Sequence, residues 1–208
     1  MEEKAFPANW YDQSIRVDPL QRFWHRRRFA EVSHIITPAG GKVLDIGCND
    51  GTFSKVIFEK TKARKLIGID TDFKSITWAN KHKGGKAIEF LVGDASRLNF
   101  RNDSFEAVFC LEVLEHVKDP LKVLKEIRRV MKSSGYGVLL VPSDSFLFRL
   151  VWFLWLKFYP RGWVWRGTHI QSFRNNYLPR LCQEAGFKIE INKKFNLGML
   201  HLVKVRKT

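Results

Sequence analysis

The sequence has little cysteine. Cys48, Cys110 and Cys182 are too few and too scattered for a disulfide framework, and they lack the paired spacing of a zinc site. A secretory signal is also missing, because acidic Glu2 and Glu3 stand where a basic segment would precede an apolar run. We therefore expect a cytoplasmic protein in a reducing environment.

Internal repeats and low-complexity linkers are absent too. A chain of 208 residues with 45% hydrophobic content can fill one substantial core, so we expect a single domain. We divide it into four parts: an N-terminal helical cap (1–39), a core (40–142), an aromatic insertion (143–170), and a C-terminal helix with a hairpin (171–208).

Negative charge is scarce. Lys and Arg number 36 against 21 Asp and Glu, which gives a formal net charge of +15. A surplus of this size attracts anionic partners, either nucleic acid or anionic lipid. Because the cations are spread along the chain in short clusters, solvated helix faces explain the surplus equally well.

Apolar strands alternate with segments of helical periodicity. The pattern predicts strands at 43–46, 65–70, 88–92, 105–111, 138–141, 187–195 and 199–205. It predicts helices at 18–37, 52–60, 75–83, 120–132 and 177–185, with a turn at 133–137. The alternation indicates an α/β, Rossmann-like fold: a mostly parallel seven-stranded sheet with helices on both faces and a terminal antiparallel hairpin.

Polar residues and glycines follow three successive strands. Gly47 and Gly51 bracket a loop after the first strand, and Asn49 between them tolerates a positive φ. Asp70 ends the second strand, where a carboxylate can accept hydrogen bonds from ribose hydroxyls. Asp94 follows the third strand and can read an adenine amino group. Each acid alone is equally compatible with a structural cap, but the series indicates a nucleoside site.

With the segment from Leu111 to Val117, these residues resemble the ordered motifs of class I S-adenosylmethionine methyltransferases over 40–142. The resemblance implies cofactor contacts from Asp45, Gly47, Cys48, Asn49, Gly51, Asp70, Thr71, Asp94, Ala95, Leu111 and Glu112. A dinucleotide-dependent oxidoreductase is the competing interpretation, but its loop would have glycines where Cys48 and Asn49 stand.

Methyl transfer from a sulfonium needs an aligned nucleophile and the exclusion of water. For a hydroxyl acceptor, His116, His169 and Glu115 are the candidate catalytic residues. Glu112, Glu115 and His116 resemble a metal-associated triplet of small-RNA 2′-O-methyltransferases and ubiquinone-pathway O-methyltransferases, so a divalent cation is one option. The alternative is that the triplet only orders its loop.

The aromatic segment 146–165 is the most distinctive part of the chain. Its first 14 residues are too short to span a bilayer and are interrupted by Arg149 and Lys157. On a helix these cations lie about 80° apart, leaving a broad aromatic face. This pattern is typical of an interfacial helix on an anionic membrane, and a buried lid over an apolar pocket is the alternative. Both favour a hydrophobic substrate.

Three further segments resemble the ubiquinone-pathway O-methyltransferases. They are Gly167-Thr-His169, with Phe173 and Leu178 after it, and, near the start of the chain, Trp10-Tyr-Asp12 and Asp18-Pro-Leu20. The resemblance implies that the aromatic insertion attaches to a membrane. It also implies that an arginine before the glycine loop meets the methionine end of the cofactor, and Arg28 is the nearest by spacing.

We therefore expect O-methylation of a hydrophobic, lipid-like or prenylated small molecule by a peripheral membrane enzyme. The alternatives are an RNA methyltransferase and a non-catalytic, cofactor-binding membrane adaptor. The place after the fourth strand lacks the Asn/Asp-Pro-Pro-aromatic motif of enzymes that methylate amino groups of nucleic acids. The sequence leaves the oligomeric state open.

Overall fold

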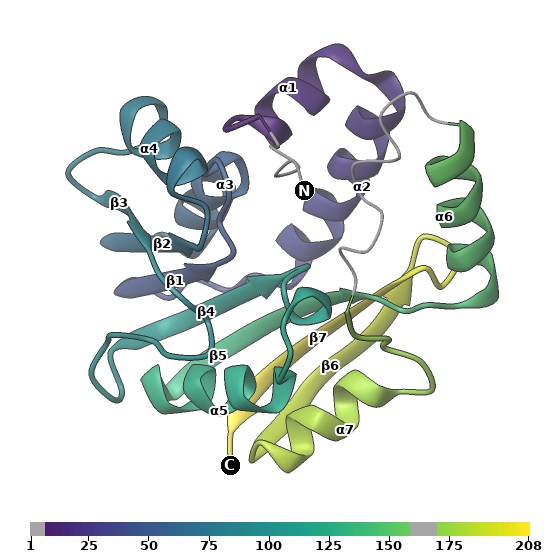
Figure 1. Cartoon of the computed structure of the whole chain (residues 1–208). Helices are drawn as coiled ribbons and strands as arrows, with labels where there is room; N and C mark the ends of the chain where they lie inside the picture. Colours follow the sequence, from purple (N-terminus) through teal and green to yellow (C-terminus); the bar gives the residue numbers. More distant parts are fainter. Residues whose placement is uncertain (1–6, 159–169) are drawn as a thin grey trace.

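The computed structural model describes residues 7–158 and 170–208, which form a twisted sheet with helices on both faces (Figure 1). The strands are β1 Lys42–Ile46, β2 Lys65–Asp70, β3 Ile88–Val92, β4 Phe105–Leu111, β5 Met131–Pro142, β6 Phe187–Phe195 and β7 Leu200–Lys207. The helices are α1 Trp10–Val17, α2 Pro19–Ile35, α3 Thr52–Thr61, α4 Phe73–His82, the short 3₁₀ helix η1 Leu114–His116, α5 Pro120–Val130, α6 Phe146–Phe158 and α7 Tyr177–Glu184.

The strand order in the sheet is β3-β2-β1-β4-β5-β7-β6. Strands β1 to β5 pair in parallel, whereas β7 is antiparallel to both β5 and β6. The predicted mostly parallel, seven-stranded α/β sheet with a terminal hairpin is confirmed. Because the order reverses between β1 and β4, the loops after these strands meet at one edge, where open α/β sheets bind ligands.

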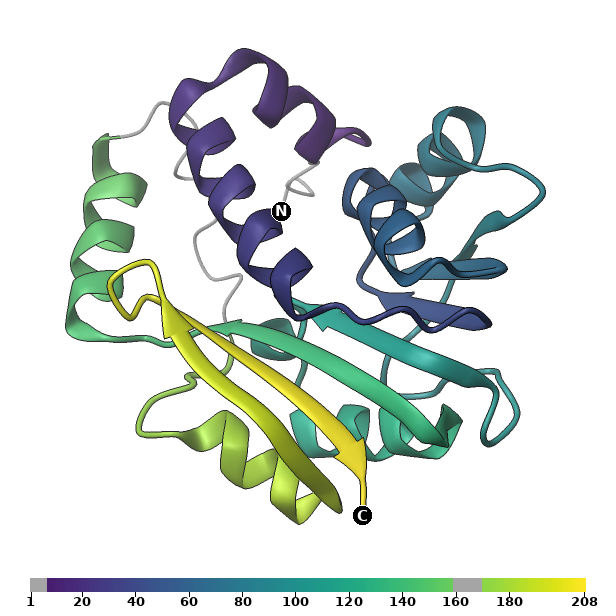
Figure 2. The same ribbon diagram turned by 180° about the vertical axis from the view of Figure 1, so that it is seen from behind.

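Two apolar clusters lie on opposite faces of the sheet. Helices pack on both of these faces (Figure 2). Neighbouring residues of β5 alternate between them, as the period of a strand requires: Leu139 belongs to one cluster and Leu140 to the other. Helices α5 and α7 cover the first face, and α2 and α3 cover the second. The N-terminal helices are thereby held beside the loop that follows β1.

The region after α5 differs from the prediction. The helix ends at Val130 rather than at 132, because buried Met131 pairs with Phe105 and begins β5. The predicted turn at 133–137 is instead an irregularity within that strand, where the register passes from the Met131 pair to the pairing of Tyr136 with Ala107. Periodicity alone does not reveal a bulged strand, since its extra residues look like a turn.

The start of the aromatic insertion is helical. Helix α6 exposes Phe146 by 82%, Phe153 by 57% and Phe158 by 69%, and Phe148 is its buried side chain. The remainder of the insertion, 159–169, lies outside the described residues. In the part of the chain that is described, no helix combines the length and apolar character needed to cross a bilayer.

Candidate functional site

The loop between β1 and α3 has the backbone shape that its glycines predict. Gly47, Asn49 and Gly51 adopt φ values of +73°, +46° and +71°. A Cβ on Gly47 would lie 2.2 Å from the Val113 side chain, so both conformation and space require glycine there. The N–H groups of Gly47 and Cys48 donate to the carbonyl of Ile69, at 2.8 and 3.0 Å, which ties the loop to the end of β2.

Asp70 supports this loop directly. Its Oδ2 accepts the N–H of Asn49 at 2.9 Å, and its Oδ1 accepts the N–H of Asp72 at 3.0 Å. Burial raises the pKa of the Asp70 carboxyl, and these backbone hydrogen bonds oppose the shift. Each carboxylate oxygen keeps a second lone pair, so Asp70 can still accept from a diol. Thr71 beside it is exposed.

Asp45 lies buried beneath the same loop. Its Oδ2 accepts the Ser54 hydroxyl at 2.6 Å, and desolvation raises the pKa of Asp45 to about 7. After β3, Asp94 is exposed and its Oδ1 accepts the N–H of Ser96 at 2.8 Å, whereas Ala95 is buried. One Asp94 oxygen therefore holds its turn while the other remains available to a ligand.

Arg28 reaches this edge from α2. Its guanidinium pairs with Glu112, which follows Leu111 at the end of β4 and adopts a φ of +57°. The guanidinium also lies over the rings of Tyr11 and Phe29, with its Cζ 5.2 and 5.3 Å from their centroids. The structure thus brings together Arg28 and Glu112, which the family resemblance implies are both cofactor contacts.

Glu115 is 1% exposed within η1, and its Oε2 has no hydrogen-bond partner among the residues that the structure describes. Desolvation raises the pKa of Glu115 to about 8. Its carbonyl accepts the N–H groups of Ile170 and Gln171 at 2.8 and 3.0 Å, so the chain that follows the aromatic insertion docks on η1. His116 is half-buried beside it, and His169 lies outside the described residues.

Glu112, Glu115 and His116 do not assemble as a metal site. Across residues 7–158 and 170–208, no three His, Cys, Asp or Glu side chains lie close enough together to hold an ion. The described geometry does not support the metal option, because the Glu112 carboxylate pairs with Arg28 while the Glu115 carboxyl is buried. Their spacing in the sequence correctly places these residues on one loop. It does not determine whether their side chains converge on one point.

Sequence reasoning missed two sets of contacts. Asp144, directly after β5, accepts the N–H of Phe173 on its Oδ2 at 2.9 Å, and it stands where the rule that found Asp70 would have found it. In α1, the N–H of Asp12 donates to Asp50 Oδ2 at 2.9 Å. The Asp12 carboxylate pairs with Lys83 at 3.0 Å. No sequence pattern signals this second contact.

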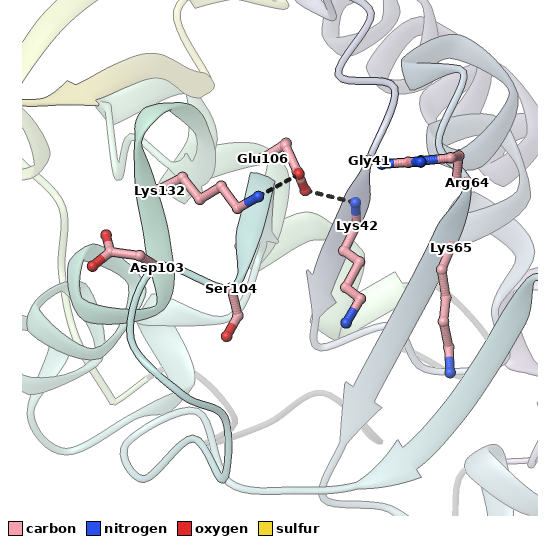
Figure 3. Close-up of a pocket in the computed structure, with 8 residues that line it drawn as sticks. All are labelled: Gly41, Lys42, Arg64, Lys65, Asp103, Ser104, Glu106 and Lys132. Atoms are coloured by element: carbon pink, nitrogen blue, oxygen red, sulfur yellow. Dashed lines mark hydrogen bonds and ion pairs between the residues drawn. The ribbon is translucent and has the colours of Figure 1, made fainter.

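A pocket of about 390 Å³ lies at the opposite edge of the sheet (Figure 3). Lys42 and Lys65, which begin β1 and β2, line it. Glu106 accepts from Lys132 Nζ at 2.7 Å and from the N–H of Lys42 at 2.6 Å, and Lys65 pairs with Glu89 at 2.7 Å. We interpret this cluster as a set of contacts that join neighbouring strands, remote from the C-terminal ends of those strands.

Comparison with known proteins shows the family to which the chain belongs. Residues 20–191 match the model of a family described as a methyltransferase domain. The chain is 30% identical over 190 residues to a ubiquinone biosynthesis O-methyltransferase of Thiobacillus denitrificans, covering 87% of this chain and 78% of that protein. It is 28% identical over 211 residues to a demethylmenaquinone methyltransferase of Lactobacillus johnsonii, covering 92% and 85%.

Solved structures share the fold. An S-adenosylmethionine-dependent methyltransferase from Mesorhizobium loti superposes with a TM-score of 0.67 at 17% identity, covering 85% of this chain and 96% of that one. At this identity the likeness concerns the fold alone.

Proposed function

Since the chain belongs to the methyltransferase-domain family and is an S-adenosylmethionine-dependent methyltransferase, we propose that it methylates a hydroxyl oxygen of a hydrophobic, lipid-like molecule at a membrane surface. One observation carries the proposal. The chain leaves the candidate site at Asp144, immediately enters the exposed aromatic helix α6, and returns to the site at Ile170 on Glu115. An apolar segment is thus anchored to the site at both ends.

The groups at the C-terminal ends of the parallel strands fit S-adenosylmethionine chemically. Arg28 offers a cation for a carboxylate, and Glu112 offers an anion for an ammonium or sulfonium. Asp70 retains lone pairs for ribose hydroxyls, and the tight loop at Gly47 allows close approach. When bound, the cofactor supplies an electrophilic methyl group.

Glu115 and the two histidines have different acid–base roles in this proposal. Because burial raises the pKa of Glu115 to about 8, its carboxyl keeps its proton at neutral pH and is a poor base there. A base for the substrate hydroxyl is better supplied by a histidine, and His116 and His169 are the candidates. The buried surroundings of η1 also help to exclude water from the acceptor.

The names of the relatives support a quinone-like acceptor. One is named as an O-methyltransferase of ubiquinone biosynthesis and the other as a methyltransferase of demethylmenaquinone, so both names refer to quinones, and the first names an oxygen acceptor. The exposed phenylalanines of α6, with Arg149 and Lys157 on the same helix, suit contact with an anionic bilayer from which such a molecule would be drawn.

The test is turnover with methyl-labelled S-adenosylmethionine and vesicles that hold a prenylated catechol. A parallel arm offers the same catechol without its prenyl chain, and another offers RNA. We expect label in the prenylated ether, with Asp70→Asn as the cofactor-binding control. Label in RNA alone would favour the rival interpretation from net charge, and no label in any arm would favour the adaptor.

A further inference from the structure

The corner between α1 and α2 exposes three large apolar side chains. Val17 ends α1 and is 73% exposed, while Leu20 and Phe23 in the first turns of α2 are 58% and 64% exposed. We call Val17, Leu20 and Phe23 the α1–α2 corner. Exposed single apolar residues are ordinary, but three within seven positions at the junction of two helices form a local patch.

The corner is held in one conformation rather than frayed. Asp18 caps α2, accepting the N–H groups of Leu20 and Gln21 at 2.9 and 3.1 Å. The guanidinium of Arg22 reaches back to α1 and donates to the carbonyls of Ile15, at 2.7 Å, and Arg16, at 2.5 Å. The apolar side chains are therefore presented on a fixed turn.

The sequence around the patch is rich in arginine. Between positions 16 and 27 the chain has Arg16, Arg22, Arg26 and Arg27 against one acid, Asp18. Two of these arginines form ion pairs within their helices: Arg16 with Asp12 at 3.0 Å and Arg27 with Glu31 at 3.7 Å. Around the axis of α2, Leu20, Phe23 and Arg27 lie within about 60° of one another, at 100° per residue. An arginine beside an apolar tip suits a bilayer surface, where the guanidinium meets phosphates while the tip enters the acyl region.

The corner lies at the same end of the molecule as the C-terminal end of α6, in both views of the fold (Figures 1 and 2). Exposed Phe158 ends that helix. Resting on the proposed function, we infer that the α1–α2 corner is a second contact with an anionic membrane, separate from α6. A nucleic acid would gain little from aliphatic Val17 and Leu20, because phosphate contacts dominate its binding.

This second contact would bring the site close to the bilayer. Phe23 and Arg28 are five residues apart on α2, which is about 7.5 Å along the helix axis. Arg28 in turn pairs with Glu112 at the site. A lipid-like acceptor would then need to rise only a short distance from the membrane to reach the methyl donor.

The first test is co-sedimentation of the full chain with vesicles containing phosphatidylglycerol. The corner variant is Leu20→Ser with Phe23→Ser, the α6 variant is Phe153→Ser with Phe158→Ser, and Phe73→Ser on α4 is the control, since Phe73 is similarly exposed at 69%. We expect the corner variant and the α6 variant each to weaken binding at least about tenfold, with the control unchanged.

The second test is a fluorescent label at Phe23→Cys. The natural cysteines Cys48, Cys110 and Cys182 are buried, so an environment-sensitive probe will attach selectively. A blue shift on adding vesicles supports insertion. If the α6 variant loses binding while the corner variant binds normally and the probe does not shift, this inference is wrong and the proposed function stands. If the wild-type chain does not bind vesicles, both fail.

Discussion

At the scale of single residues, Glu115 is the most unusual group in the site. Its carboxyl is buried with one oxygen unpaired, and the raised pKa follows from desolvation and the neighbouring charge of Asp144, with Arg28 acting in the opposite direction. A buried carboxyl without an ion-pair partner is more stable in its neutral, protonated form than as a carboxylate. The protein's stability should therefore depend on pH through this residue.

We predict that Glu115→Gln removes part of that dependence. Unfolded Glu115 ionises near pH 4.5, whereas folded Glu115 keeps its proton to about pH 8, so wild-type stability falls as pH rises through this range. Relative to wild type, the variant should gain on the order of 3 kcal/mol between pH 5 and pH 8. Denaturant unfolding at both values measures it, and an equal difference at the two values would contradict the assignment.

Asp70 gives a second prediction at this scale. Asp70→Asn replaces a carboxylate oxygen by an amide donor, and it should weaken S-adenosylmethionine binding at least about tenfold by calorimetry, because charged hydrogen bonds are the stronger ones. Asp72→Asn is the matched control. Asp72 caps α4 through Lys74 and Ser75, so its loss should affect stability and leave affinity unchanged. Equal affinity of Asp70→Asn and wild type would remove Asp70 from the cofactor site.

At the scale of elements, α1 fastens the glycine loop to α4. Asp12 contacts Asp50 through its N–H and Lys83 through its carboxylate, and both members of the Asp12–Lys83 pair are largely buried. The pair is less screened than a surface pair, so it contributes more than an exposed one. The helix is short, and its position depends on these contacts.

We predict that Lys83→Ala loosens α1. Amide hydrogen exchange in α1 should become several-fold faster, because local opening no longer breaks the Asp12 pair. Lys81→Ala is the control, since Lys81 is exposed on the same helix. Unchanged protection in the Lys83 variant would mean that the backbone contact to Asp50 alone holds α1.

At the scale of the whole molecule, the surplus of +15 does not choose a partner by itself. The salt dependence of binding separates the two classes of partner, RNA and anionic membranes. Binding to RNA through phosphates alone should fall at least about tenfold between 50 and 200 mM salt. Binding to anionic vesicles should fall less, because inserted apolar side chains do not depend on screening. Equal slopes in co-sedimentation would contradict an apolar contribution to membrane binding.

The order of strands and helices followed from local information. The bounds of β2, β3, β4 and β6 are as predicted, because apolar periods and flanking turns are properties of neighbouring residues. The gathering of Gly47, Asp70 and Asp94 at one edge also followed, since parallel strands end on the same side. The sequence by itself therefore determined the fold and the placement of these three residues at one edge of the sheet.

Only the tertiary structure decided the rest. The Arg28–Glu112 pair, the contact of α1 with Asp50, and the docking of Ile170 on Glu115 each join segments far apart in the chain. Periodicity and motif spacing do not encode such distances. Glu115 acquired its raised pKa in the same way, because desolvation comes from everything packed around the carboxyl and not from its neighbours in the sequence.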